Sequence, residues 1–248
     1  MNSPAFVRIA PFALWIACIA LESLASAAGA LGWTALAAAA DSGWGYALRT
    51  ALVAAVLALF WRHYGELRGG SAGEAGLRSA SSAASPGASR PAPRGAQLAQ
   101  ALAAGALVFA AWITLGPWLL VGGPSTPRIP PGAGGAPDAL WLLFRVAGSA
   151  LVVPLIEELF WRSYLMRRID TADFLSLPPA RVSATAVLAS SAIFALEHRE
   201  LAAGLAAGLL YAWLYRRHQD LRLPVLAHAT TNALLAAYVV GATRYEFW

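Results

Sequence analysis

The sequence lacks lysine and has a single cysteine, and both shortages narrow the kind of protein it can be. All 18 basic residues of the 248-residue chain are arginine, and the one cysteine, Cys18, lies inside an apolar run. One cysteine excludes an intrachain disulfide and a cysteine metal cluster. Arginine-only usage, together with abundant alanine and glycine, indicates a GC-rich bacterial gene.

Charged residues are also scarce. They make up 12% of the chain, whereas hydrophobic residues make up 58% and the mean hydropathy is +0.57. A soluble core of this size could not hide so much apolar surface, so we expect lipid to be the solvent for much of it. The formal net charge of +5 resides mainly in arginines between apolar segments, which is typical of membrane topology signals and not of nucleic-acid binding.

Seven apolar stretches predict the fold class. A membrane crossing needs about 20 mostly apolar residues at about 1.5 Å per residue. Because an open strand edge cannot satisfy its hydrogen bonds in hydrocarbon, the stretches should all be helical. We therefore expect an all-α, polytopic transmembrane helical bundle of about seven spans. The predicted spans are 9–28, 44–61, 98–121, 139–161, 183–198, 200–215 and 223–241.

Composition divides the chain into three parts. Residues 65–96 are rich in Gly, Ser, Ala and Pro without an apolar period, which predicts a disordered linker. The linker separates a two-helix N-terminal membrane segment, 1–64, from a core, 97–248. Arginines flank the linker, whereas the loops 29–43 and 122–138 hold none and one, so the linker and the N-terminus are predicted to be cytoplasmic. The expected location is the bacterial inner (plasma) membrane, with multiple passes.

Three polar clusters interrupt the apolar core, and the first lies near the end of span 139–161. An ionisable residue costs roughly 2.5 to 3.5 kcal/mol at the bilayer centre, so each one needs a partner or a function. A spacing of four places Glu158 and Arg162 on one helix face as an ion pair, while Glu157 is turned about 100° away. The alternative is a helix end that enters the headgroup region with a salt bridge.

The second and third clusters each contain a histidine. His198 follows Phe194 by four residues at the end of a predicted span, where an interfacial histidine is the alternative explanation. His228 and Asn232 share one face of the last span, four residues apart. Two aligned polar side chains could simply hold that helix to a neighbour.

Together the clusters form a known set of motifs. They read EExxxR, FxxxH and HxxxN on successive helices, and this order at helix-length spacing resembles the CAAX prenyl protease and bacteriocin-processing (CPBP) family of intramembrane endopeptidases, over roughly residues 139–242. The stretches FWRSYLMRR and LYRRHQDLRLPVLAHATTN and the closing Glu246-Phe247-Trp248 further resemble the subgroup associated with exosortase systems. Family members commonly have glycine after the motif arginine, where this chain has Ser163.

The resemblance implies a glutamate-type, metal-independent endopeptidase that hydrolyses a peptide bond of a membrane-associated protein. Peptide hydrolysis needs an activated water and stabilisation of the oxyanion. By resemblance, Glu157 and His198 activate the water, and His228 and Asn232 donate hydrogen bonds to the oxyanion.

The two remaining motif residues have a supporting role by the same resemblance. Glu158 and Arg162 are expected to hold the motif helix and Glu157 in place. No cofactor is implied. The expected partners are the lipid bilayer and a membrane-associated protein or peptide substrate, with exosortase-type sorting as the suggested context, and no nucleic acid.

Three alternatives stay open. Two histidines with one or two glutamates are an acceptable zinc set, although the sequence has no HExxH pattern. A catalytically silent membrane scaffold or immunity-type protein of the same fold would use the polar residues only for helix packing. A transporter would predict inverted repeats and broken helices, and no such symmetry is apparent in the sequence.

Overall fold

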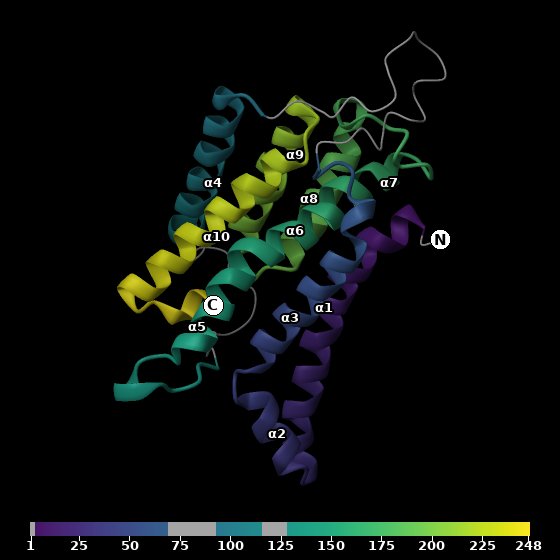
Figure 1. The fold of residues 1–248 in the computed structure, drawn as a ribbon. Coiled ribbons are helices and arrows are strands. Elements are labelled where there is room, and N and C mark those ends of the chain that lie inside the picture. Colours follow the sequence, from purple (N-terminus) through teal and green to yellow (C-terminus); the bar gives the residue numbers. More distant parts are fainter. Residues whose placement is uncertain (1–2, 69–92, 116–127) are drawn as a thin grey trace.

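The computed structural model describes residues 3–68, 93–115 and 128–248, which form a bundle of helices (Figure 1). These described residues contain no β-strand; Pro131 and Pro137 form an isolated bridge. The longer helices are α1 Pro4–Ala27, α3 Gly45–Phe60, α4 Gly95–Leu115, α8 Ala184–Leu196, α9 Leu201–His218 and α10 Arg222–Ala242. Shorter pieces are η1 Ala28–Leu31, α2 Thr34–Asp41, η2 Trp61–His63, η4 Ala133–Gly135, η7 Pro179–Arg181 and η8 Tyr245–Phe247.

The chain is a multi-pass membrane protein, and the predicted all-α bundle is confirmed. The seven predicted spans are helical over most of their described length, except at Trp44, Ser183, Glu197, His198 and Glu200; the end of span 98–121 lies outside the described residues. Within the described ranges, five helices are long and apolar enough to cross a membrane by themselves. Helix α8 has only 13 residues, and α9 does not reach the required hydropathy. The five are Pro4–Leu31, Gly45–His63, Gly95–Leu115, Ala139–Asp170 and Arg222–Ala242.

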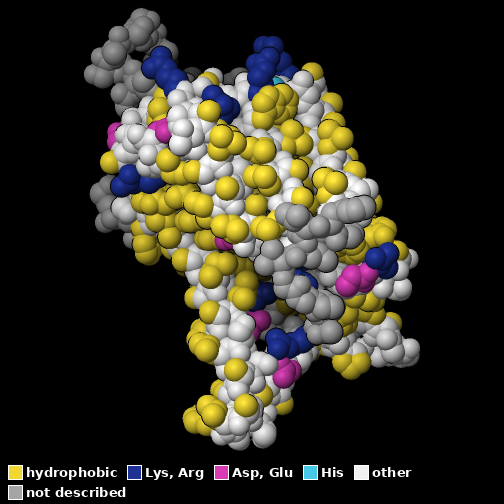
Figure 2. All heavy atoms as spheres, turned by 180° about the vertical axis from the view of Figure 1, so that it is seen from behind, with side chains coloured by type: hydrophobic (Ala, Val, Ile, Leu, Met, Phe, Trp, Pro, Cys, Tyr) yellow, Lys and Arg dark blue, Asp and Glu magenta, His cyan; other side chains and the backbone are white. Residues whose placement is uncertain are grey.

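The surface of the bundle fits a lipid environment. Figure 2 shows hydrophobic side chains across the middle of one face, with arginines gathered at the upper end and further charged residues below. Large apolar side chains lie outward on several helices, for example Leu59 at 76% exposure and Leu196 at 73%. In hydrocarbon such side chains need no partner within the protein, so their exposure is favourable there.

The helix that carries the first motif is long and contains two π-helical stretches. Residues Ala139–Asp170 form one run of 32 residues, in which α-helical and π-helical stretches alternate. Pro154 has no N–H to donate to the preceding turn, and the wider π pairing directly precedes the α6 segment that contains it. Such π-helical stretches occur frequently at functional sites. The run consists of α5 Ala139–Ala147, η5 Gly148–Val152, α6 Val153–Glu157, η6 Glu158–Leu165 and α7 Met166–Asp170.

This motif helix lies between two groups of helices. One hydrophobic core joins it to α1 and α3 through residues such as Val7, Val53 and Ile156. The other joins it to α4, α8, α9 and α10 through residues such as Trp161 and Phe194. The helix therefore has protein on both sides, which allows polar side chains on it to be removed from both water and lipid.

Close helix approach in the second group depends on glycine. A Cβ atom on Gly105 of α4 would lie 2.4 Å from the Ala227 carbonyl oxygen of α10. Small residues at helix interfaces let backbones approach closely in membranes. A side chain at position 105 would therefore push α10 away from α4, and α10 carries His228 and Asn232.

We expect Gly105→Ala to lower the thermal unfolding midpoint in detergent, because the steric clash outweighs the gain of roughly 1 kcal/mol in helix propensity. The measurement is the midpoint of loss of folded protein in size-exclusion chromatography after heating. Gly241→Ala, in α10, is the control, since nothing lies within 4 Å of a Cβ at that position. Equal midpoints for the two variants would contradict this packing.

An ion pair ties the N-terminal helices to the motif helix. Arg8 of α1 is 2% exposed, and its guanidinium donates to both carboxylate oxygens of Glu66, at 2.6 to 3.0 Å. The Nε atom of Arg8 also lies 3.0 Å from the hydroxyl oxygen of Ser163, and this hydroxyl donates to Glu66. Burial raises the pKa of Glu66, but Arg8 and Ser163 outweigh it and hold the pKa below its ordinary range. Residues far apart in the sequence thus share one network.

This network includes a residue at the start of the predicted linker. The predicted linker 65–96 falls largely outside the described residues, but Glu66, at its start, is bonded to the bundle. Ser163, at the position where the resembling family commonly has glycine, supplies a hydroxyl to this contact.

We expect Arg8→Ala to destabilise the protein by about 3 to 5 kcal/mol at pH 7, because it leaves the Glu66 carboxylate without its partner. The contribution of Glu66 is present above its ordinary pKa of 4.5 and is lost as the pH falls through the lower folded value. The stability difference from the wild type should therefore narrow below about pH 4.5. Chemical unfolding in detergent at pH 7 and pH 4 measures it, with Arg62→Ala, an exposed arginine, as control. A difference that widens at low pH would contradict the assignment.

Candidate active site

All four predicted catalytic residues line one cavity. It has a volume of about 410 Å³ and lies between the motif helix, α8, α9 and α10, with Trp15 of α1 and Trp112 of α4 also on its wall. The structure therefore brings together residues that are up to 75 positions apart in the sequence, from three motifs on different helices. The four residues are Glu157, His198, His228 and Asn232.

Glu157 presents a carboxylate to this cavity. It ends α6, directly before the π-helical stretch η6, and is 8% exposed. Its Oε2 atom is buried and has no hydrogen-bond partner among the described residues. A buried polar atom without a partner is costly unless it serves a purpose. No described residue thus uses the hydrogen-bonding capacity of this oxygen.

The imidazole of His228 lies between the two glutamates. Its Nδ1 is 3.0 Å from Oε1 of Glu158, and its Nε2 is 3.9 Å from Oε2 of Glu157. Because a carboxylate oxygen accepts, Nδ1 is the donor in the shorter contact. The ring also stacks on Tyr211, with centroids 5.1 Å apart and planes 23° apart. These contacts fix the orientation of the ring and direct Nε2 toward Glu157.

Glu158 and Arg162 form the ion pair that their spacing predicts, but in the protein interior. The Arg162 Nε lies 3.2 Å from Glu158 Oε2, and the two side chains are 3% and 0% exposed. The guanidinium carbon also lies 4.4 Å from the centroid of the Phe194 ring. This burial contradicts the alternative of a helix end that enters the headgroup region. Glu158 therefore links Arg162 to His228.

His198 lies just beyond a helix and not within one. We predicted a span 183–198, but α8 ends at Leu196 and α9 begins at Leu201. The His198 Nδ1 lies 2.8 Å from the carbonyl oxygen of Phe194, one of the last carbonyls of α8, which lack partners within the helix. Because a carbonyl can only accept, Nδ1 carries the hydrogen and Nε2 remains an acceptor. The FxxxH spacing thus sets the tautomer of the histidine.

Asn232 joins α10 to the first π-helical stretch of the motif helix. Its Nδ2 donates to the carbonyl oxygen of Ser149 at 2.7 Å. The amide has a second N–H and an acceptor oxygen. Asn232 therefore holds two helices together, as the packing alternative expects, and still has a donor for the cavity that it lines.

The motifs did not point to two further residues of the cavity wall. Tyr211, in α9, stacks on His228, and its hydroxyl lies 2.7 Å from the Thr231 hydroxyl. Glu197, next to His198, also lines the cavity. A tyrosine inside an apolar helix needs a partner for its hydroxyl, which is the one sequence signal that could have singled out Tyr211.

Metal ligation was a further alternative. Within the described ranges, no group of three or more His, Cys, Asp or Glu side chains is placed to hold a metal ion. The zinc set considered from the sequence therefore has no matching arrangement among these residues.

Comparison with known proteins gives one match. Residues 139–234 match the family model of type II CAAX prenyl endopeptidases, Rce1-like, and this segment contains all three motifs. The family resemblance inferred from the motifs is thereby confirmed. No curated protein and no solved structure matches the chain.

Proposed function

We propose, from the match of residues 139–234 to the Rce1-like CAAX endopeptidases, that the protein is an intramembrane endopeptidase that cleaves a membrane-associated protein with a water activated by Glu157 and His198. The observation that carries the proposal is that Glu157, whose Oε2 has no hydrogen-bond partner among the described residues, lines one cavity with His198, His228 and Asn232. We include proteins sorted by exosortase-type systems among the candidate substrates, because of the subgroup resemblance.

The first step is attack by water. Glu157 accepts a proton from the water, His198 orients the same water through its acceptor Nε2, and the oxygen forms a bond to the scissile carbonyl carbon. The proton then passes to the amide nitrogen, the C–N bond breaks, and a carboxylate and an amine leave. The unpartnered carboxylate oxygen of Glu157 and the tautomer of His198 support these roles. Neither role calls for a metal ion.

Stabilisation of the oxyanion falls to His228 and Asn232. The Nδ1–H of His228 donates to Glu158, which is itself paired with Arg162, and this contact holds the ring with Nε2 toward Glu157 and the cavity, where a protonated ring donates to the oxyanion. The second N–H of Asn232 adds a donor without a change of charge. Donors held in place before the reaction are the usual means of stabilising a tetrahedral oxyanion.

We expect Asn232→Ala to lower kcat by about 10² to 10³, the usual effect of removing one oxyanion donor, with a smaller change in KM. The assay is cleavage of a membrane substrate by purified protein in detergent. Thr230→Ala is a control on the same helix: its hydroxyl bonds the Leu226 carbonyl and it does not line the cavity. If Asn232→Ala loses only thermal stability and keeps its kcat, the residue serves helix packing alone.

The substrate can be found in cells of the source organism. Membranes from cells with wild-type protein and with Glu157→Gln should be compared by mass spectrometry of protein termini. The proposal predicts one or more membrane-associated proteins that lose a peptide only in the wild type. Identical termini in the two strains would favour the scaffold or immunity-type alternative. The same cells also allow a test of topology. If the N-terminus is cytoplasmic in the inner membrane, as proposed, a tag on the N-terminus should be protected from protease added outside that membrane.

A further inference from the structure

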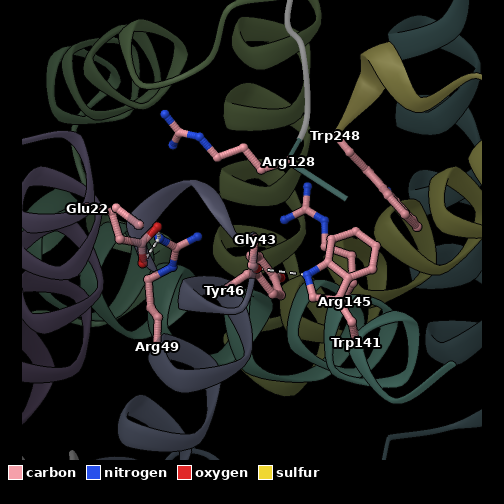
Figure 3. Close-up of a pocket in the computed structure, with 9 residues that line it drawn as sticks. Glu22, Gly43, Tyr46, Arg49, Arg128, Trp141, Arg145 and Trp248 are labelled. Atoms are coloured by element: carbon pink, nitrogen blue, oxygen red, sulfur yellow. Dashed lines mark hydrogen bonds and ion pairs between the residues drawn. The ribbon is translucent and has the colours of Figure 1, made fainter. Parts of the chain in front are cut away.

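A second pocket adjoins the catalytic cavity. It has a volume of about 230 Å³, and Figure 3 shows the side chains that line it. Tyr46, Arg49, Arg145 and Trp248 line both this pocket and the catalytic cavity, so the two hollows are neighbours. The second pocket also has Arg128 on its wall, and we refer to it as the arginine pocket. None of the three sequence motifs contributes to it.

The charges of the arginine pocket do not balance. Arg49 lies 3.0 Å from Glu22, and Arg128 lies 2.8 Å from Asp41. Arg145 makes no ion pair within the described part of the chain, although it belongs to a membrane-spanning helix. An arginine at such a position normally has an anionic partner or a function.

The guanidinium of Arg145 donates to the Tyr46 hydroxyl, and its other N–H groups remain available. The guanidinium carbon lies 4.2 Å from the ring centroid of Tyr46 and 5.2 Å from that of Trp248. Aromatic rings contact the face of a guanidinium, whereas its N–H groups point outward in the plane. Arg49, which is 8% exposed, adds a buried Nε without a hydrogen-bond partner among the described residues. Two arginines on the shared wall therefore have donors for an anion.

The distance to the catalytic glutamate limits where that anion can be. Arg145 precedes Glu157 by twelve residues on the same helix, which corresponds to about 18 Å along the axis. An extended peptide covers about 3.3 Å per residue, so about five residues span this distance.

We propose that Arg145, with Arg49, binds a carboxylate that the substrate carries about five residues from the scissile bond. The proposal rests on the proposed endopeptidase function and adds a chemical class of substrate to it. Guanidinium and carboxylate groups pair through two parallel hydrogen bonds, which gives geometric specificity as well as charge. The carboxylate is either the end of the substrate chain or an acidic side chain, and both place the same group in the pocket.

The test measures binding, so that it does not depend on turnover. Full-length protein with Glu157→Gln, in phosphatidylcholine nanodiscs, is titrated against three fluorescein-labelled leucine–alanine dodecapeptides by fluorescence polarisation. The first ends in a free carboxylate, the second ends in an amide, and the third ends in an amide but carries one internal glutamate. We expect one of the two acidic peptides to bind at least about tenfold more tightly than the neutral one, and its identity tells the source of the carboxylate.

Substitutions then assign the preference to the pocket. Arg145→Gln should abolish the preference for the acid, and Arg145→Lys should retain part of it, because lysine keeps the charge without the bidentate geometry. Arg62→Gln removes an exposed arginine elsewhere and should leave the preference unchanged. Equal affinities of the three peptides, including no binding of any, would overturn the proposal even if Arg145→Gln did not fold.

Three outcomes distinguish this proposal from the endopeptidase function and from lipid binding. If the wild type prefers the acidic peptide through Arg145 but cleaves nothing, the carboxylate site is supported and the endopeptidase function is contradicted. If the protein cleaves a substrate but shows no preference for the acidic peptides, the endopeptidase function is supported and the carboxylate site is contradicted. Retention of phosphatidylglycerol by the wild type but not by Arg145→Gln, with equal binding of the peptides, would assign the site to a lipid headgroup and overturn the proposal.

Discussion

Glu157→Gln is expected to reduce cleavage of a membrane substrate by about 10⁴-fold or more while the protein still inserts and folds. The amide has nearly the same size as the carboxylate but cannot accept the proton of water. In the wild type, Oε2 of Glu157 has no hydrogen-bond partner within the described residues, so replacing it breaks no hydrogen bond of that oxygen. Mass spectrometry of the product measures the rate, and thermal unfolding in detergent measures the fold.

Glu158, next to Glu157, is expected to respond differently to the same substitution, through stability. Glu158→Gln removes the charge from a fully buried ion pair with Arg162 and should cost about 3 to 5 kcal/mol of stability. Glu157→Gln should cost far less. If Glu157→Gln kept full activity, or if it prevented insertion, the carboxylate would be structural and the scaffold alternative would gain support.

His198→Ala is expected to have an effect of similar size, because the histidine and Glu157 are proposed to act on one water. The effects of substituting residues that act as a unit do not add. The double variant Glu157→Gln/His198→Ala should therefore cleave at a rate within about threefold of that of the slower single variant. The two single variants and the double variant, assayed together in single-turnover experiments, form the cycle.

An exposed position serves as control for this cycle. Glu246 lies in η8 at the surface, and Glu246→Gln should leave the cleavage rate unchanged, alone or combined with either active-site substitution. Additive losses from Glu157→Gln and His198→Ala would contradict a shared water and would indicate two separate roles.

The N-terminal helices, which carry no family motif, complete the site. Trp15 of α1 and Tyr46 and Arg49 of α3 lie on the wall of the catalytic cavity. The network of Arg8, Glu66 and Ser163 joins this part to the motif helix. Residues 1–64 therefore belong to the same structural unit as the matched segment, and a chain without them would lack part of the cavity wall.

The helices and the motif ion pair were predictable because their signals are local. Apolar runs of sufficient length indicate membrane helices, and a spacing of four indicates that Glu158 and Arg162 meet. The conversion of the motif helix to π-helical pairing at Gly148–Val152 and Glu158–Leu165 was not predictable from these rules, because apolar runs and spacings of four do not distinguish α-helical from π-helical pairing. His198 was placed on a helix because nothing in its sequence shows that α8 ends at Leu196.

Long-range contacts explain the remaining differences. Arg8 and Ser163 are 155 positions apart, so no local pattern relates them. Arg167 lies near the end of an apolar helix, where an arginine can be a topology signal, yet it is 5% exposed and donates to the carbonyl oxygens of Leu175 and Leu177. An arginine near a helix end has both uses, and only the three-dimensional contacts distinguish them.

The central claim is that Glu157 activates water for peptide hydrolysis in this cavity. Its most direct test is cleavage of the substrate identified in cells by purified full-length protein in nanodiscs, with EDTA present and in water enriched in ¹⁸O. The account predicts a new carboxylate that carries ¹⁸O, at a rate that EDTA does not change and that Glu157→Gln abolishes. Absence of a hydrolysed product, or activity that EDTA abolishes and zinc restores, would contradict it.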